Sequence, residues 1–207
     1  MPRFDEDMPD DRREAIALKA LALFLSRGYS GTSMSMVAKA AGIRKASLYH
    51  HFASKEALFL AALSADVAAS LAQVDHLMKR GDGTPADRFR IALGLFYDAM
   101  VRSSIGALTT VISETAQSFP AVAEGFHDNF IARFQTTLVD VYQPCVAAGS
   151  HRDLPETTVH DVVFGPLLSI AMSEKMFGQT PHVAAIWSKG RSRSEFVDRM
   201  DTLLRSD

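Results

Sequence analysis

The chain has 207 residues, of which 47% are hydrophobic and 22% are charged, and its formal net charge is −2. This composition predicts a globular protein with one or two domains and argues against wholesale disorder. The single cysteine, Cys145, excludes an internal disulfide and a cysteine-based metal site. The longest uncharged apolar stretch, residues 162–173, is shorter than the roughly twenty residues that cross a bilayer. Because the acidic start is unlike an export signal, we expect a cytoplasmic protein.

Charge is distributed unevenly along the chain. Residues 1–11 carry a net charge of −4, residues 12–55 a net charge of +7, and residues 56–207 a net charge of −5. A basic block on an acidic body indicates that only the N-terminal part meets a polyanion. The alternative at this point is a solvated helix surface that happens to be basic.

Apolar residues recur at helical spacing, while alternating β-branched runs are absent. The pattern predicts an all-α protein with about nine helices. In the N-terminal part the expected helices cover residues 11–27, 33–41, 44–50 and 55–79. Gly28 and Gly42 are placed to end the first two helices, and Thr32 or Ser33 is placed to cap the start of the second.

A Gly-Asp-Gly-Thr-Pro segment at residues 81–85 is the clearest linker, with Pro85 suited to open the next helix. Beyond it we expect helices at residues 85–102, 104–118, 121–148, 156–177 and 193–205, with residues 181–190 partly loop. Pro166 is expected to bend or interrupt its helix, because proline removes a helix hydrogen bond. Cys145 is expected to be buried and inert.

Residues 32–60 contain two short helices joined by a tight turn, which is the shape of a helix-turn-helix. Val37 and Leu48, eleven residues apart, are placed to meet across the turn, and Gly42 can adopt the positive φ that the turn needs. The N-terminal residues of a recognition helix reach base edges in the major groove. The alternative is a plain three-helix bundle. The expected base contacts are Arg44, Lys45, Ala46 and Ser47, and the expected phosphate contacts are Thr32, Ser33, Tyr49, His50 and Lys55.

Four short patterns stand in order along this region: Gly-x-x-x-Thr-Ser from Gly28, Ala-x-Ala-Ala-Gly from Ala38, Leu-Tyr-x-x-Phe from Leu48 and Ser-Lys-Glu-x-Leu from Ser54. With the preceding helix, residues 11 to about 60 resemble the N-terminal domain of the tetracycline-repressor (TetR) family. Two positions depart from the family's common pattern: Arg44 stands where serine is common and Ala46 where glycine is common. The first departure affects which bases are read.

The resemblance implies an all-α homodimeric repressor whose C-terminal domain binds a small effector that releases the DNA. Two further segments, residues 113–120 and 164–168, are more weakly reminiscent of one common C-terminal type in the family. We therefore expect a disordered tail at residues 1–10, a helix-turn-helix DNA-binding domain at residues 11–54, and a helical effector-binding and dimerisation domain at residues 55–207.

Two C-terminal segments, residues 162–172 and 196–204, are more apolar than the surface of a monomer requires. The family resemblance favours pairing of these segments with a second copy in a four-helix bundle. The residues expected at this dimer interface are Phe164, Leu167, Leu168, Ala171, Phe196, Met200, Leu203 and Leu204.

Aromatic and methionine side chains are concentrated in the middle of the body, where they could line an adaptable apolar pocket or fill an ordinary core. Such a lining favours a hydrophobic or aromatic effector. The residues expected around it are Phe96, Met100, Glu114, Phe119, Phe126, His127, Phe130, Phe134, Met172, Met176 and Trp187.

The remaining chemistry-bearing residues form no recognisable site. The seven histidines are scattered without metal-ligand spacing, and there is no Gly-x-Ser-x-Gly nucleophile elbow. We therefore expect a sequence-specific transcriptional regulator, a repressor that a small molecule releases from a palindromic operator, with no enzymatic activity, metal, cofactor or membrane partner. The alternative is a helical carrier or enzyme whose basic N-terminus is incidental. Sequence does not separate a repressor from an activator, because that depends on where the operator lies.

Overall fold

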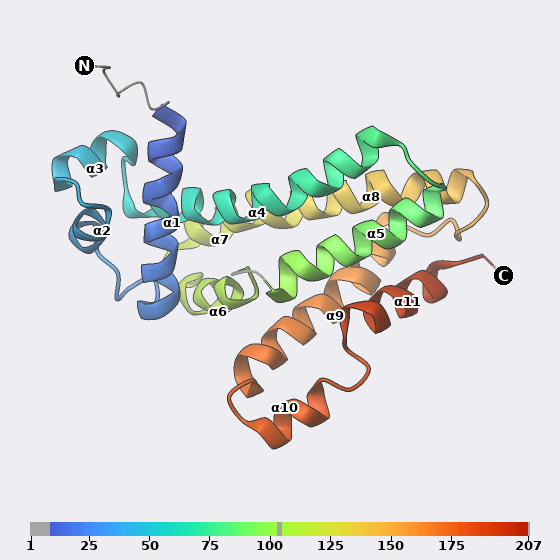
Figure 1. Ribbon diagram of the computed structural model, residues 1–207. Helices are drawn as coiled ribbons and strands as arrows, with labels where there is room; N and C mark the ends of the chain where they lie inside the picture. Colours follow the sequence, from blue (N-terminus) through green and yellow to red (C-terminus); the bar gives the residue numbers. More distant parts are fainter. Residues whose placement is uncertain (1–8, 103–104, 207) are drawn as a thin grey trace, which may run out of the picture. The chain divides into compact units, whose positions relative to one another are not determined.

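The structure is a computed structural model that describes residues 9–102 and 105–206. Within those ranges every regular element is a helix, and the one β-type pairing is an isolated bridge between His151 and Arg205. The α-helices are α1 (Pro9–Arg27), α2 (Met34–Ala41), α3 (Lys45–His51), α4 (Lys55–Arg80), α5 (Pro85–Tyr97), α6 (Ile105–Thr115), α7 (Pro120–Phe126), α8 (Ala132–Ala147), α9 (Glu156–Phe177), α10 (Pro181–Trp187) and α11 (Arg193–Leu204) (Figure 1). The all-α prediction is confirmed.

The described residues form eleven α-helices where about nine were expected. The helix expected over residues 121–148 is divided into α7 and α8 by a π-helical turn at His127–Ile131, and residues 98–102 form a second π turn at the end of α5. The segment expected to be partly loop after residue 181 contains α10. Pro166 does not interrupt α9, which runs through it.

The chain is divided into two compact units. The first runs to Asp66 and includes Val111–Asn129, and the second consists of Val67–Thr110 and the chain from Phe130 onward. The domain boundary expected after residue 54 stays a prediction. Residues 1–8 of the tail expected at residues 1–10 lie outside the described residues. No helix in the described ranges is long and apolar enough to cross a membrane.

Local capping explains where several helices begin. Ser33 precedes α2 and its hydroxyl accepts a hydrogen bond from the Met36 backbone N–H at 3.3 Å. Thr84 opens α5 by a reciprocal pair of hydrogen bonds with Asp87, and Ser192 opens α11 in the same way. Such pairs satisfy backbone N–H groups that a helix start leaves without partners.

An aromatic cluster forms the core of the first unit. Phe24 and Tyr29 stack with ring centroids 5.8 Å apart, and Phe59 contacts them edge-on at 4.9 and 5.4 Å. The ring centroid of Phe119 lies 5.0 Å from that of Tyr29. Because Phe24, Tyr29 and Phe59 are at most 2% exposed, the cluster holds α1, the start of α4 and the approach to α7 together.

In the second unit, α5 packs against α8 and α11, and α9 packs against α8, α10 and α11. Phe96, Phe130 and Phe134 form one part of the core, with the Phe96 and Phe134 centroids 4.6 Å apart. Cys145 is fully buried, as expected, and burial raises the pKa of its thiol to about 11. A thiol that ionises so reluctantly is a poor nucleophile.

A buried ionic network joins distant parts of this unit through Asp201 on α11. One Asp201 oxygen accepts hydrogen bonds from Arg90 at 2.9 Å and from Arg205 at 3.0 Å, and the other lies 3.2 Å from Nε2 of His151. The Asp201 side chain is 3% exposed and that of His151 is fully buried. Burial opposes ionisation of Asp201, but the two arginines outweigh it and lower the pKa of the carboxyl.

His151 is expected to make the free energy of unfolding depend on pH. Burial lowers the pKa of its imidazole below the ordinary 6.5, although Asp201 acts in the opposite direction. The unfolded chain therefore takes up this proton first, so stability is full above about pH 6.5 and falls as the pH drops toward the folded-state pKa. Urea unfolding between about pH 7.5 and 5 checks this. His151→Gln should flatten the dependence, whereas His127→Gln, at an exposed site, should leave it unchanged; equal slopes in all three proteins would contradict the role of His151.

Candidate DNA-binding surface and helical body

Helices α2 and α3 pack against each other and form the expected helix-turn-helix. Val37 and Leu48 are both fully buried, as a locking pair between the two helices requires. Gly42 ends α2 with φ +70° and ψ +27°, and its N–H is directed at the carbonyls of Ala38 and Lys39. The Ile43 N–H then donates to the Ala38 carbonyl at 3.0 Å, which closes the turn.

Gly42→Ala is expected to lower the free energy of unfolding by about 1–2 kcal/mol, the cost of a left-handed backbone for a residue with a Cβ. A Cβ at this position would meet no atom within 4 Å, so crowding adds nothing to that cost. Gly42→Asn should be less destabilising, because asparagine tolerates this conformation better. Urea unfolding of the three proteins measures the difference, and an alanine variant as stable as the wild type would contradict this account.

The N-terminal end of α3 is exposed and has few internal contacts. Arg44 occupies the N-cap position, so α3 begins at Lys45, one residue later than expected, and the Arg44 side chain makes no capping hydrogen bond. Arg44, Lys45 and Ala46 are exposed and Ser47 is half-buried. The Lys45 ammonium lies 5.9 Å from the Tyr49 ring centroid. The side chains predicted to read bases therefore remain available to a partner.

Among the predicted phosphate contacts, Ser33, Tyr49 and His50 are exposed. Thr32 is different: it is 2% exposed, and its hydroxyl donates within 3.1 Å of the Leu23 and Gly28 carbonyls. Its backbone N–H donates to the Tyr29 carbonyl at 3.3 Å. Thr32 thus fastens the loop to the end of α1, and we remove it from the set of phosphate contacts.

Lys55, at the start of α4, lies over the face of a buried aromatic ring. Its ammonium is 4.2 Å from the Tyr29 ring centroid, a distance typical of a cation–π contact. Burial lowers the pKa of Lys55, while the neighbouring Glu56 carboxylate acts in the opposite direction. The ring orients the ammonium at the α4 N-terminus, where backbone N–H groups also favour an anion.

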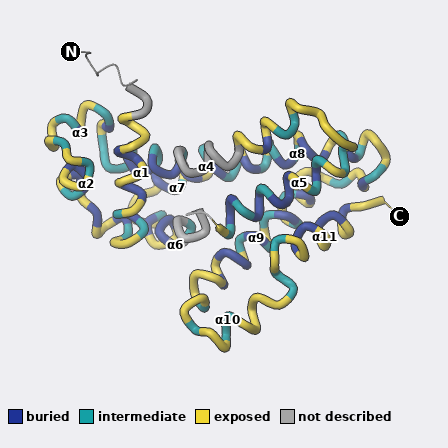
Figure 2. Tube along the Cα trace, in the orientation of Figure 1, coloured by how far each residue is buried: buried dark blue, intermediate teal, exposed yellow. Residues whose placement is uncertain are grey.

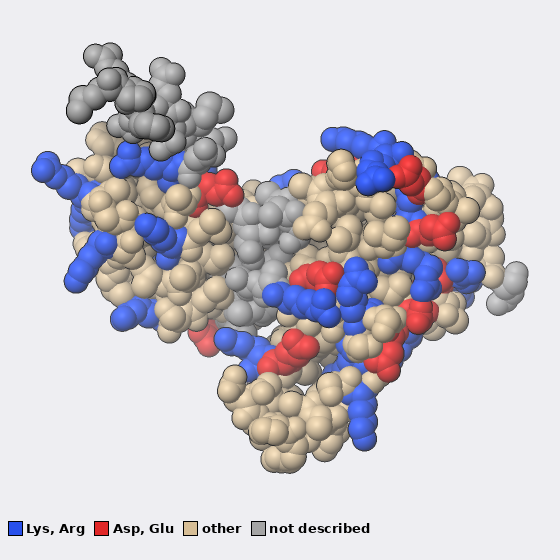
Figure 3. All heavy atoms as spheres, viewed as in Figure 1, with Lys and Arg blue, Asp and Glu red and all other residues tan. Residues whose placement is uncertain are grey.

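Lysine and arginine side chains gather on the surface of the first unit. In the view of Figure 3 they surround α1, α2 and α3, whereas the second unit shows acidic and basic groups side by side. This matches the net charge of +7 over residues 12–55. A predominantly basic surface beside an exposed helix end attracts a polyanion.

Five of the eight residues predicted at the dimer interface lie in the core of their own chain. Leu167, Ala171, Phe196, Met200 and Leu204 are at most 5% exposed and belong to the core of their own chain. They face inward because α11 packs mainly against α5, and α9 packs against α8 and the turn at residues 98–102.

Four other apolar residues of α9 follow one another at a spacing of four. Phe164 and Leu168 are half-buried, while Met172 and Met176 are 42% and 64% exposed. On α11, Leu203 is 49% exposed. Figure 2 shows exposed positions along this part of α9 and along α10. We call Phe164, Leu168, Met172 and Met176 the α9 stripe.

Most residues of the predicted effector pocket lie either in a packed core or on the surface. Phe96, Met100, Phe130 and Phe134 are at most 1% exposed and fill the core of the second unit. In the first unit, Phe126 is buried, Phe119 contacts Tyr29, Glu114 is exposed, and the exposed His127 pairs with Asp128. Met172 and Met176 lie on the exposed α9 stripe. Of the predicted set, Trp187 is the one that lines a cavity described for the second unit.

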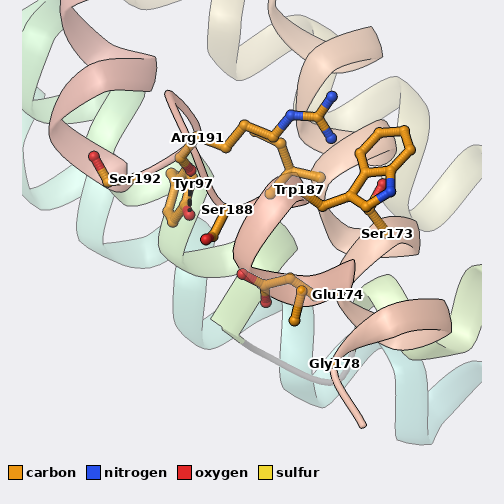
Figure 4. A pocket seen from close by; sticks show the side chains of 10 residues that line it. Tyr97, Ser173, Glu174, Gly178, Trp187, Ser188, Arg191 and Ser192 are labelled. Carbon is orange, nitrogen blue, oxygen red and sulfur yellow. Dashed lines mark hydrogen bonds between the residues drawn. The ribbon is translucent and has the colours of Figure 1, made fainter. Parts of the chain in front are cut away.

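That cavity is bordered by residues which sequence reasoning did not select, among them Tyr97, Glu174 and Arg191 (Figure 4). They come from three separate segments, and no pattern in the sequence marks them as neighbours. In the described part of the chain, no group of three or more His, Cys, Asp or Glu side chains is arranged to hold a metal ion.

Comparisons with known proteins agree with this geometry. Residues 16–62 match the family model described as bacterial regulatory proteins, tetR family. The chain is 33% identical over 97 residues to the HTH-type transcriptional activator FasR of Mycolicibacterium smegmatis. This match covers 47% of this chain and 44% of FasR. It is 37% identical over 78 residues to the HTH-type transcriptional repressor NemR of Escherichia coli. This match covers 38% of this chain and 39% of NemR. The chain thus matches less than half the length of these relatives.

The fold extends the likeness beyond the N-terminal region. The structure of the transcriptional regulator FadR from Bacillus subtilis, in complex with stearoyl-CoA, superposes with a TM-score of 0.72 at 14% identity and covers 91% of this chain and 97% of that one. At this identity the likeness concerns the fold alone. Residues 16–62 therefore carry the helix-turn-helix of the tetR family of bacterial regulatory proteins, and the whole chain shares an all-helical fold with FadR.

Proposed function

We propose that the protein is a sequence-specific DNA-binding transcriptional regulator. The observation that carries the proposal is the exposed N-terminal end of α3 on a helix-turn-helix whose inner face buries Val37 and Leu48. Inserted into the major groove, this end presents Arg44 and Lys45 to base edges, and Arg44 can pair with the O6 and N7 atoms of guanine. Ser33, Tyr49, His50 and Lys55 then contact phosphates, and Ala46 and Ser47 complete the surface that reads bases.

The proposed regulator acts as a homodimer on a palindromic operator. The α9 stripe with Leu203 offers apolar surface to a second copy, and Gly165 and Ser169 are small enough for close approach. Two recognition helices about 34 Å apart read successive major grooves. Such a protein works in the cytoplasm beside the chromosome and needs no catalytic group.

The proposed sign of regulation is repression, relieved by a small-molecule effector bound in the helical body. FadR provides a precedent for a ligand, since it was solved with stearoyl-CoA. NemR is described as a repressor and FasR as an activator, so relatives of both signs exist. Release requires the effector to bind one of two conformations more tightly than the other.

Selection of bound duplexes from a random DNA pool, at two salt concentrations, tests the proposal. A regulator of this kind enriches an inverted repeat, and affinity for it falls as the salt concentration rises. Enrichment of no sequence at either salt concentration would overturn the proposal. It would favour the alternative, a helical carrier or enzyme whose basic N-terminal surface is incidental.

A further inference from the structure

A cavity of about 390 Å³ lies in the second unit between α9, α10 and the segment that leads into α11. Its volume lies within the range of small-molecule sites, which is roughly 300–1,000 Å³. The side chains that matter for the argument are Tyr97, Ile170, Glu174, Ala184, Trp187 and Arg191.

Arg191 supplies the cavity with a cation that lacks a full set of partners. Its guanidinium carbon lies 4.3 Å from the Trp187 ring centroid, so the group is held against the indole. Its Nη1 atom is buried and, among the described residues, has no hydrogen-bond partner. A buried donor without an acceptor is costly, and a carboxylate is the acceptor that matches a guanidinium best.

The Arg191 backbone is fixed in place. The Tyr97 hydroxyl on α5 donates to the Arg191 carbonyl at 2.9 Å, and the Arg191 N–H donates to the Ser188 carbonyl at 3.2 Å. The site is therefore built before a ligand arrives, which reduces the entropic cost of binding.

The other walls limit the chemistry of the ligand. Trp187, Tyr97 and Ile170 provide aromatic and apolar surface, which favours a compact apolar body. Glu174 lines the same cavity, and Figure 4 shows its carboxylate apart from the Arg191 guanidinium. A second negative charge near Glu174 would be repelled, so the surroundings favour one anionic group at Arg191 and disfavour a dianion.

We propose that this cavity binds a compact apolar or aromatic monocarboxylate, whose carboxylate accepts hydrogen bonds from Arg191 while its body packs against Trp187. The inference rests on the proposed function only for the role of the ligand, which is that of the effector of the regulator. Ligand bound between α9 and α10 contacts the same helix that carries the α9 stripe, so it can bias how two copies pair.

Trp187 is the single tryptophan of the chain and lines the cavity, so its fluorescence reports on this site. We would titrate the full-length protein without DNA, using benzoate, cyclohexanecarboxylate and the corresponding primary amides as probes. The carboxylates should change Trp187 emission saturably, and the amides should bind about tenfold more weakly or worse. Equal affinity for acids and amides, or no saturable change with any probe, would overturn the proposal.

Two matched pairs of variants sharpen the test. Arg191→Gln should weaken carboxylate binding about tenfold or more without affecting the amides, while Lys189→Gln removes the same charge two residues away and should change nothing. Ala184→Phe should fill the cavity and abolish binding, whereas Ala185→Phe, at an exposed neighbour outside the lining, should not. Equal losses in Arg191→Gln and Lys189→Gln, or carboxylate binding retained in Ala184→Phe, would overturn the proposal.

The two proposals fail separately. The titration uses no DNA, so an absence of operator selection leaves the Trp187 result readable. Conversely, a protein that selects an inverted repeat but shows no carboxylate response would retain the proposed function and lose this inference.

Discussion

Arg44→Ala is expected to weaken binding to the selected operator about tenfold to a hundredfold for each half-site, the equivalent of about 1–3 kcal/mol for a bidentate base contact. Binding to random DNA should fall much less, because a base contact contributes little where the sequence does not match. Lys45→Ala should likewise weaken binding to the operator more than binding to random DNA. Electrophoretic or anisotropy titrations on operator and random duplexes at one salt concentration measure both affinities.

Lys55→Ala is the contrasting variant. Lys55 sits over Tyr29 at the α4 N-terminus, where we expect it to contact phosphate. Its loss should weaken binding to operator and random DNA alike and reduce the salt dependence of binding by about one ion for each half-site. If Arg44→Ala, Lys45→Ala and Lys55→Ala reduced both affinities by the same factor, the assignment of base and phosphate contacts would be wrong.

Asp201→Ala is expected to lower the free energy of unfolding by about 3 kcal/mol, because it leaves partners of a buried charge unpaired. Asp201 is the shared acceptor of Arg90 and Arg205, and it faces the fully buried His151. The loss should lie at the lower end of the range for buried pairs, since the Arg90 and Arg205 side chains are 37% and 53% exposed and can gain water. Urea unfolding at neutral pH measures it.

Asp198→Ala provides the matched control on the same helix. Asp198 also pairs with Arg90, but its side chain is 63% exposed, so its removal should cost less than about 1 kcal/mol. Similar losses at Asp198 and Asp201 would show that burial of Asp201 contributes no special stability. The comparison changes the same residue type on one helix, so differences in helix propensity cancel.

The helix-turn-helix was predictable because its determinants are local. Ser33, Gly42 and the pair formed by Val37 and Leu48 lie within sixteen residues, and each acts through its own backbone or an adjacent turn. The same holds for α9, whose observed limits are those that the spacing predicts, since Pro155 precedes it and Gly178 follows it. The sequence alone also indicated the all-α class and the basic N-terminal block.

The predicted dimer interface and pocket depended on information that a helical pattern lacks. Apolar spacing indicates that α9 and α11 are amphipathic, but not whether an apolar position faces its own core or a second copy. The packing of α9 and α11 against the other helices of the second unit placed Leu167 and Met200 inside and left Met172 and Met176 outside.

Contacts between residues distant in sequence were decided by the tertiary structure alone. Arg90 and Asp201 are 111 residues apart, and the Arg191 cavity combines α5, α9 and α10 with the segment before α11. By itself the sequence determined the helices and the character of the N-terminal surface, because capping, spacing and charge act over a few residues. Folding decided which buried charges meet and where a cavity remains, because these depend on how closely whole helices pack.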